Sequence, residues 1–125
     1  MPALRIEHVN VTVRDVDRAA DLMRRVFGWH IRWQGPAMSG GRTIHVGSDD
    51  AYIALYGPRG GLSDEGFAKG RPLNHIGVEV DDLDATEERV LAAGLKTFSH
   101  GSYDPGRRFY FNDHDGIEYE VVSYR

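Results

Sequence analysis

The sequence contains no cysteine. Disulfides and thiolate metal sites are therefore excluded, and any metal ion must bind through His, Asp or Glu side chains. No apolar run approaches the roughly 20 residues that a membrane-spanning helix needs. The stretch from Met1 to Glu7 is too short for a signal peptide before a strand pattern begins. These absences favour a cytoplasmic protein without membrane contacts.

A clustered basic surface is also missing. The chain has 15 Lys and Arg residues against 19 Asp and Glu residues, a net charge of −4, and the two signs are interspersed. Because nucleic-acid binding needs a concentrated basic face, we expect no nucleic-acid partner. At 125 residues the chain has the length of one domain, which can bury about two-thirds of its unfolded surface in a core.

What the sequence does contain is an approximate internal repeat. Residues 8–17 align with residues 75–84, an offset of 75 − 8 = 67, and each copy begins with a histidine. A second alignment, with an offset of 66, matches residues 42–55 to residues 108–121 and places Ala54 opposite Glu120. An internal repeat predicts two similar structural units.

The hydrophobic pattern gives each copy the same order of elements. Residues 6–13 alternate between apolar and polar, which predicts a half-buried strand with His8 on its polar face. Asp15 is suited to cap the helix that follows, and Gly28 is suited to end it. The other expected elements are strands at 29–33, 42–46 and 51–56, then in the second half strands at 73–80, 95–98, 107–112 and 117–122 around a helix at 83–93 capped by Asp82.

Each half therefore reads strand, helix, strand, strand, strand, which predicts an α+β fold. Between the halves, residues 57–72 contain five glycines and two prolines, the composition of a linker or a mobile flap.

Two histidines and a carboxylate stand out as candidate metal ligands. His8 and His75 occupy equivalent positions on the polar faces of two equivalent strands, and Glu120 lies on the polar face of the last strand. Two imidazoles and one carboxylate on one side of a metal suit non-haem Fe(II), and Mn or Zn also occupy such sites. Glu118, two residues from Glu120, is the alternative carboxylate.

Three segments carry a family resemblance that covers essentially the whole chain. They are the opening His8–Asp15, its copy Asn74–Asp82, and the closing Phe109–Val121 with its Asp-His-Asp-Gly turn. Together they resemble the vicinal oxygen chelate superfamily, which includes glyoxalase I, extradiol dioxygenases, methylmalonyl-CoA epimerase, and bleomycin and fosfomycin resistance proteins. The resemblance implies one domain over residues 1–125.

That fold consists of two tandem βαβββ modules, about 4–57 and 73–125, joined by a linker at about 57–72. They form a partly open barrel with a concave cleft for metal and ligand. Small chains of this kind often form homodimers, sometimes with sites across the dimer interface, so the resemblance also implies a homodimer.

The resemblance implies roles for individual residues. His8, His75 and Glu120 match metal-ligand positions, whereas Ala54 stands where the four-ligand lyases and epimerases place Glu or Gln. The three ligands that remain resemble the set of the extradiol dioxygenases. The cofactor implied is a divalent metal ion, with Fe(II) favoured and Mn, Zn or Ni as alternatives.

Tyr110, ten residues before Glu120, stands at the spacing of an active-site tyrosine of those dioxygenases, and His100 lies within about one residue of the position of a histidine near the metal site in those enzymes. We therefore expect Tyr110 as a hydrogen-bond donor and His100 as an acid-base group. The alternatives are an ordinary strand tyrosine and an exposed loop histidine.

By alternation, Tyr52 and Tyr56 share a strand face with Ala54, where they either line the substrate pocket or only pack together. His45 aligns with Phe111 and is interpreted as structural. Arg42 and Arg108 also align in the repeat. They can bind a substrate carboxylate, although surface arginines are the commoner case. Glu7 is expected to point away from the face that carries His8.

The leading functional hypothesis is a metal-dependent enzyme that acts on a small molecule with vicinal oxygens, in the manner of an extradiol dioxygenase. A glyoxalase-like lyase is the alternative enzyme. A non-catalytic, drug-sequestering binding protein is the alternative of another class, because Trp29, Trp33, Tyr52 and Tyr56 can stack on flat ligands.

Overall fold

The computed structural model describes residues 5–37, 40–61, 69–70, 73–103 and 106–125. The chain divides into two units, Met1–Ser63 and Asp64–Arg125, and each unit is described here by itself. Residues 62–68 and 71–72, which form much of the expected linker at 57–72, lie outside the described residues.

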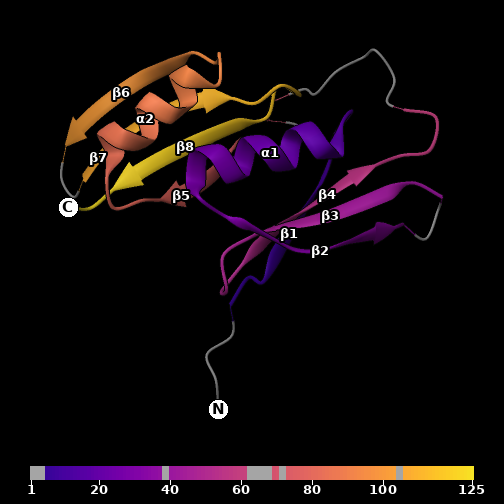
Figure 1. Cartoon of the computed structure of the whole chain (residues 1–125). Coiled ribbons are helices and arrows are strands. Elements are labelled where there is room, and N and C mark those ends of the chain that lie inside the picture. The colour runs from indigo at the N-terminus through magenta and orange to yellow at the C-terminus, as the bar shows by residue number, and fades with distance from the viewer. Residues whose placement is uncertain (1–4, 38–39, 62–68, 71–72, 104–105) are drawn as a thin grey trace. The chain divides into compact units, whose positions relative to one another are not determined.

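The first unit is one four-stranded sheet with one helix (Figure 1). Its strands occur in the spatial order β1-β4-β3-β2, so the first strand lies beside the last. β1 runs parallel to β4, and the other neighbours are antiparallel. The elements are β1 (His8–Thr12), α1 (Val16–Phe27), β2 (His30–Pro36), β3 (Arg42–Gly47) and β4 (Tyr52–Gly57).

The second unit repeats this arrangement with the order β5-β8-β7-β6. β5 is parallel to β8, and the remaining neighbours are antiparallel. Its elements are β5 (Ile76–Glu79), α2 (Leu83–Ala92), β6 (Thr97–Tyr103), β7 (Gly106–Asn112) and β8 (Glu118–Ser123). The expected α+β fold of two tandem βαβββ modules, each with an open sheet, is confirmed.

Both helices begin where the sequence predicts, because an aspartate satisfies a free backbone N–H of the first turn. Asp15 accepts from the backbone nitrogen of Arg18, and Asp82 accepts from that of Ala85, each at 3.0 Å. Gly28 ends α1 with a positive φ of 70°, a conformation that glycine adopts without steric cost. Neither described helix is long and apolar enough to cross a membrane.

The two faces of the first sheet differ in chemistry. α1 packs on β3 and β4, and the strand residues on that face are apolar and buried, among them Ile44, Val46, Ile53 and Leu55. Side chains alternate along a strand, so the intervening residues occupy the opposite face. These include His8, His45, Tyr52, Ala54 and Tyr56.

The strand ladders correct one part of the repeat alignment. Ala54 pairs with Asn10 and His45, while Glu120 pairs with Gly77 and Tyr110. Ala54 and Glu120 are therefore equivalent, as predicted. His45, however, is equivalent to Tyr110, and its alignment with Phe111 was wrong.

The misalignment of His45 arises because the turn between the last two strands differs in length between the two units. Four residues separate Gly47 from its partner Tyr52, whereas five separate Asn112 from its partner Glu118. The same shift makes Arg107, not Arg108, the equivalent of Arg42. Each of these arginines donates to an aspartate in the first turn of its unit's helix: Arg42 to Asp17 at 2.7 Å and Arg107 to Asp84 at 2.8 Å.

The longer turn is organised by Asp113, whose side chain is almost fully buried. Its Oδ1 accepts from the backbone nitrogens of Asp115 and Ile117, both at 2.9 Å. Burial raises the pKa of Asp113 to about 6, although these hydrogen bonds oppose the shift. Because the folded-state pKa is raised, the folded protein binds this proton more tightly than the unfolded chain does.

We therefore predict that Asp113 lowers stability as the pH rises from about 4 to about 6. Asp113→Asn keeps an acceptor for the two backbone nitrogens and removes the buried charge. We expect it to abolish this pH dependence and to stabilise the fold at pH 7 by about 1–3 kcal/mol. Urea unfolding between pH 4 and pH 7 measures both effects, with the exposed Asp49→Asn as control. A stability difference from wild type that stays constant over this range would contradict the prediction.

Candidate functional site

In the second unit, a histidine and two glutamates meet beside the parallel pair of strands. His75 immediately precedes β5, and the ladder pairs Ile76 with Tyr119 and Gly77 with Glu120. His75 thus lies between the side chains of Glu118 and Glu120, which share one face of β8. Its Nε2 lies 3.0 Å from Oε1 of Glu120, and its Nδ1 lies 3.8 Å from Oε2 of Glu118. The sequence-predicted pair His75 and Glu120 is in direct contact.

Each glutamate has its own cationic partner. Arg108 donates to Oε2 of Glu120 at 2.9 Å, and both of these side chains are less than 15 % exposed. Lys69 donates to Oε1 of Glu118 at 2.8 Å. Charge-assisted hydrogen bonds of this kind hold a carboxylate in one orientation. Arg108 therefore leaves Oε1 of Glu120 directed toward His75.

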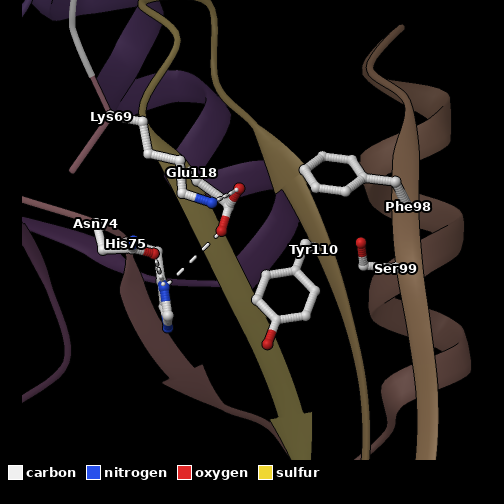
Figure 2. Close-up of a pocket in the computed structure, with 7 residues that line it drawn as sticks. All are labelled: Lys69, Asn74, His75, Phe98, Ser99, Tyr110 and Glu118. Atoms are coloured by element: carbon white, nitrogen blue, oxygen red, sulfur yellow. Dashed lines mark hydrogen bonds and ion pairs between the residues drawn. The ribbon is translucent and has the colours of Figure 1, made fainter.

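An open pocket of about 340 Å³ borders this group. Figure 2 shows His75, Glu118 and Tyr110 around β8, with Phe98 beside Tyr110. The ring of Tyr110 meets that of His75 edge to face, with centroids 5.7 Å apart, and Phe98 stacks on its other side at 6.1 Å. The full lining is Lys69, Asn74, His75, Phe98, Ser99, Tyr110 and Glu118.

His100 lies elsewhere. Its Nε2 is 2.5 Å from Oε2 of Glu87 on α2, and its ring stacks on Phe109, which is completely buried. Phe109 and Tyr110 are consecutive in β7, so their side chains occupy opposite faces of the sheet. His100 therefore contacts the helix-covered face and not the face that carries His75 and Tyr110.

The contact with His100 also changes the acidity of its partner. Hydrogen bonds from Thr97 and from His100 lower the pKa of Glu87, and the bond from Thr97 has the larger effect.

The backbone of β6 is irregular next to His100. The register shifts between Phe98 and Gly101, and Ser99 has a positive φ of 53°.

In the first unit, His8 ends a row of four rings that crosses all four strands. Trp33 contacts His45 with centroids 5.1 Å apart, His45 stacks on Tyr52 at 4.5 Å, and Tyr52 stacks on His8 at 4.9 Å. Ala54 pairs with His45 on the same face and is only 2 % exposed. Tyr52 pairs with His8 in the ladder, so it occupies the position that Glu118 has beside His75 in the second unit. Burial lowers the pKa of His45, which keeps this ring neutral within the stack.

A bulge in β2 adds a cation to the same face. The register shifts between Ile31 and Trp33, so consecutive residues reach one side of the sheet. The guanidinium of Arg32 lies 4.6 Å from the centroid of Tyr52 and donates to the backbone oxygen of Ser48.

Sequence reasoning missed two residues that contact the histidines. Glu7 was expected to point away, yet its Oε1 lies 2.8 Å from Nδ1 of His8, and this hydrogen bond lowers the pKa of Glu7. Asn74 makes the equivalent contact in the second unit, with its Oδ1 2.7 Å from Nδ1 of His75. The signal in the sequence was an oxygen-bearing residue directly before each repeated histidine.

The donor atoms of His75 and Glu120 suit a divalent metal ion. With metal–donor distances of about 2.1 Å, two adjacent ligands of an octahedral metal lie about 3.0 Å apart. That value is also the observed separation of Nε2 and Oε1. Within the described part of either unit, no three His, Asp or Glu side chains gather to hold a metal.

The family model of the Glyoxalase/Bleomycin resistance protein/Dioxygenase superfamily matches residues 5–121. A search of curated proteins gives no match.

Among solved structures, a glyoxylase/bleomycin resistance protein/dioxygenase domain from Frankia sp. EAN1pec is 26% identical, with a TM-score of 0.85 over 99% of this chain and 94% of that chain. The fosfomycin resistance protein FosX from Mesorhizobium loti is 27% identical, with a TM-score of 0.72 over 96% and 91%.

A mutant of FosX from Listeria monocytogenes, complexed with Mn(II) and 1S,2S-dihydroxypropylphosphonic acid, is 18% identical, with a TM-score of 0.75 over 96% of this chain and 92% of that chain. At that identity the likeness shows the fold alone. The family match covers nearly the entire sequence and agrees with the two βαβββ units, so the chain belongs to the Glyoxalase/Bleomycin resistance protein/Dioxygenase superfamily.

Proposed function

We propose that the protein is a metal-dependent enzyme that acts on a small molecule with two adjacent oxygen atoms. The observation that carries this proposal is the contact between Nε2 of His75 and Oε1 of Glu120, two donors at a separation that adjacent ligands of one octahedral metal can have. FosX with Mn(II) and a dihydroxy compound offers a precedent on the same fold.

The third protein ligand in this proposal is His8. The support for it is the repeat: β1 pairs with β4 as β5 pairs with β8, and His8 stands 67 residues before His75. Neither unit supplies three ligands from its own described residues.

The chain's own residues would orient the metal ligands and bind the substrate. When bound, the ion supplies Lewis acidity and open positions for two substrate oxygens. Arg108 fixes Glu120, and Asn74 fixes His75. Tyr110 lines the pocket beside His75, and we expect its hydroxyl to donate a hydrogen bond to a substrate oxygen.

The ligand set favours one reaction type within this proposal. The position equivalent to Glu120 in the first unit is Ala54, which has no donor atom. Three protein ligands leave more open positions than four, and that favours an extradiol-type dioxygenase with Fe(II) over a glyoxalase-like lyase with Mn, Zn or Ni. His100 has no role in this proposal because it contacts Glu87 on the other face.

A non-catalytic binding protein is a second candidate, and the row of rings in the first unit favours it. Trp33 ends this row and is 49% exposed, so one face of its indole can stack on a flat ligand. Such a protein would bind its ligand without a metal.

We predict near-stoichiometric metal in the purified or reconstituted protein, measured by elemental mass spectrometry. His75→Ala and Glu120→Gln should each weaken metal binding by more than about 100-fold, because the loss of outer-sphere partners alone costs 10- to 100-fold. Glu118→Gln is the matched control on the same strand and should bind metal as wild type does. Unchanged metal content in Glu120→Gln, or its loss only in Glu118→Gln, would contradict the proposed ligand set.

Oxygen consumption separates the candidate functions. We expect the Fe(II)-reconstituted protein to consume oxygen with at least one member of a catechol panel, because three protein ligands leave room for O₂ beside the substrate. Uptake should disappear with Glu120→Gln. No uptake with any catechol would favour the lyase. Quenching of tryptophan fluorescence by flat ligands that persists with a chelator would favour the binding protein.

The homodimer implied by the family resemblance remains a proposal. Light scattering should give a mass near 2 × 14.0 = 28.0 kDa at micromolar concentration. A monomer of 14.0 kDa under these conditions would contradict it.

A further inference from the structure

We infer that Glu7 and Asn74 are positioning residues that direct Nε2 of His8 and of His75 toward a metal ion. The inference deepens the proposed function and rests on it. Each of these residues immediately precedes its histidine, and the offset between them is 74 − 7 = 67, the same as for the histidines.

The chemistry of the contacts determines which ring nitrogen carries the proton. Oε1 of Glu7 lies 2.8 Å from Nδ1 of His8, and Oδ1 of Asn74 lies 2.7 Å from Nδ1 of His75. An ionised carboxylate and an amide oxygen can only accept, so Nδ1 must donate in both contacts. A neutral imidazole that donates from Nδ1 has its lone pair on Nε2, as we expect for His8, and metals bind that lone pair. Nε2 of His75 also lies 3.0 Å from the acceptor Oε1 of Glu120, so in the metal-free protein it donates there, and a bound metal ion would take the place of that proton.

The second unit shows where Nε2 then points. Nε2 of His75 lies 3.0 Å from Oε1 of Glu120, while Nδ1 lies 2.7 Å from Oδ1 of Asn74 and 3.8 Å from Oε2 of Glu118. The two ring nitrogens of His75 therefore have different partners. Nδ1 contacts Asn74, its neighbour in sequence, and Nε2 lies beside Glu120, the other proposed ligand of this unit.

The first unit holds its histidine by a second contact. The ring of Tyr52 is stacked between His8 and His45, with its plane only 12° from that of His8. The hydroxyl of Tyr52 also donates to Oε1 of Glu7 at 3.5 Å. Glu7 therefore contacts both His8 and the ring on which His8 stacks, which limits rotation of the imidazole.

The hydrogen-bond acceptor beside the histidine is a carboxylate in the first unit and an amide in the second. Glu7 carries a negative charge, whereas Asn74 is neutral. A carboxylate partner makes the imidazole a stronger donor toward a metal than an amide partner does. His75 instead has Glu120 and Glu118 as charged neighbours on its own unit.

The first test needs no metal. At about pH 9, where an ordinary imidazole is neutral, long-range ¹⁵N–¹H NMR spectra report which ring nitrogen is protonated. We expect His8 in the metal-free protein to carry its proton on Nδ1. Glu7→Ala should shift it toward Nε2, the form that free imidazole side chains prefer, and Glu7→Gln, which keeps an acceptor, should restore Nδ1.

The control is Asp49→Ala, which removes a carboxylate 3.6 Å from Nε2 of the exposed His30 and should leave His8 unchanged. A His8 protonated on Nε2 in wild type, or one that is indifferent to Glu7→Ala, would overturn the inference. This outcome is independent of whether the protein binds metal.

The second test measures zinc affinity by competition with a chromophoric chelator. Asn74→Ala and Glu7→Ala should each weaken binding about 10- to 100-fold, and Asn74→Asp and Glu7→Gln should recover most of it. Wild-type affinity in both alanine variants would overturn the positioning role while leaving the metal site intact. A wild-type protein that binds no zinc, manganese or iron would instead refute the proposed function.

Discussion

The parallel pairing of the first strand of each unit with its last strand is the constraint on which the candidate site depends. In the second unit, this pairing sets Gly77 against Glu120, and it thereby brings His75 within 3.0 Å of the same carboxylate. A parallel neighbour cannot be reached by a tight hairpin and needs a crossover connection, here through the helix and two further strands. The contact thus joins residues that are far apart in sequence, and it exists only in the folded unit.

The same scaffold carries different chemistry in the two units. Where the second unit has Glu118, Glu120 and Tyr110, the first has Tyr52, Ala54 and His45 at the corresponding ladder positions. The result is an acidic group with cationic partners in one unit and a row of stacked rings in the other. A histidine at the start of the parallel edge strand, with a hydrogen-bonding residue directly ahead of it in sequence, is common to both.

Much of the fold could be predicted because local chemistry determines it. Asp15 and Asp82 cap the helices, Gly28 ends one of them, and the alternation in residues 8–13 separates a buried face from a polar one. The sequence also predicted that His75 and Glu120 lie together, because both occupy the polar face of neighbouring strands; their role as metal ligands stays a prediction.

The failures came from features that strand periodicity does not encode. The turn around Asp113 is one residue longer than its counterpart, so an ungapped alignment displaced the preceding strand and mispaired His45 and Arg42. The bulges in β2 and β6 broke simple alternation, and His100 consequently meets Glu87 rather than the pocket. Glu7 escaped notice because alternation assigns it to the opposite face, whereas its side chain reaches back to Nδ1 of His8.

The proposal that His75 and Glu120 bind one metal ion is tested most directly by a crystal structure of the protein grown with Mn(II), with anomalous scattering recorded at the manganese edge. We predict one strong peak about 2.1 Å from Nε2 of His75 and from a carboxylate oxygen of Glu120. A peak held by Glu118 without Glu120, or no peak beside His75 in crystals that contain Mn(II), would contradict the proposal.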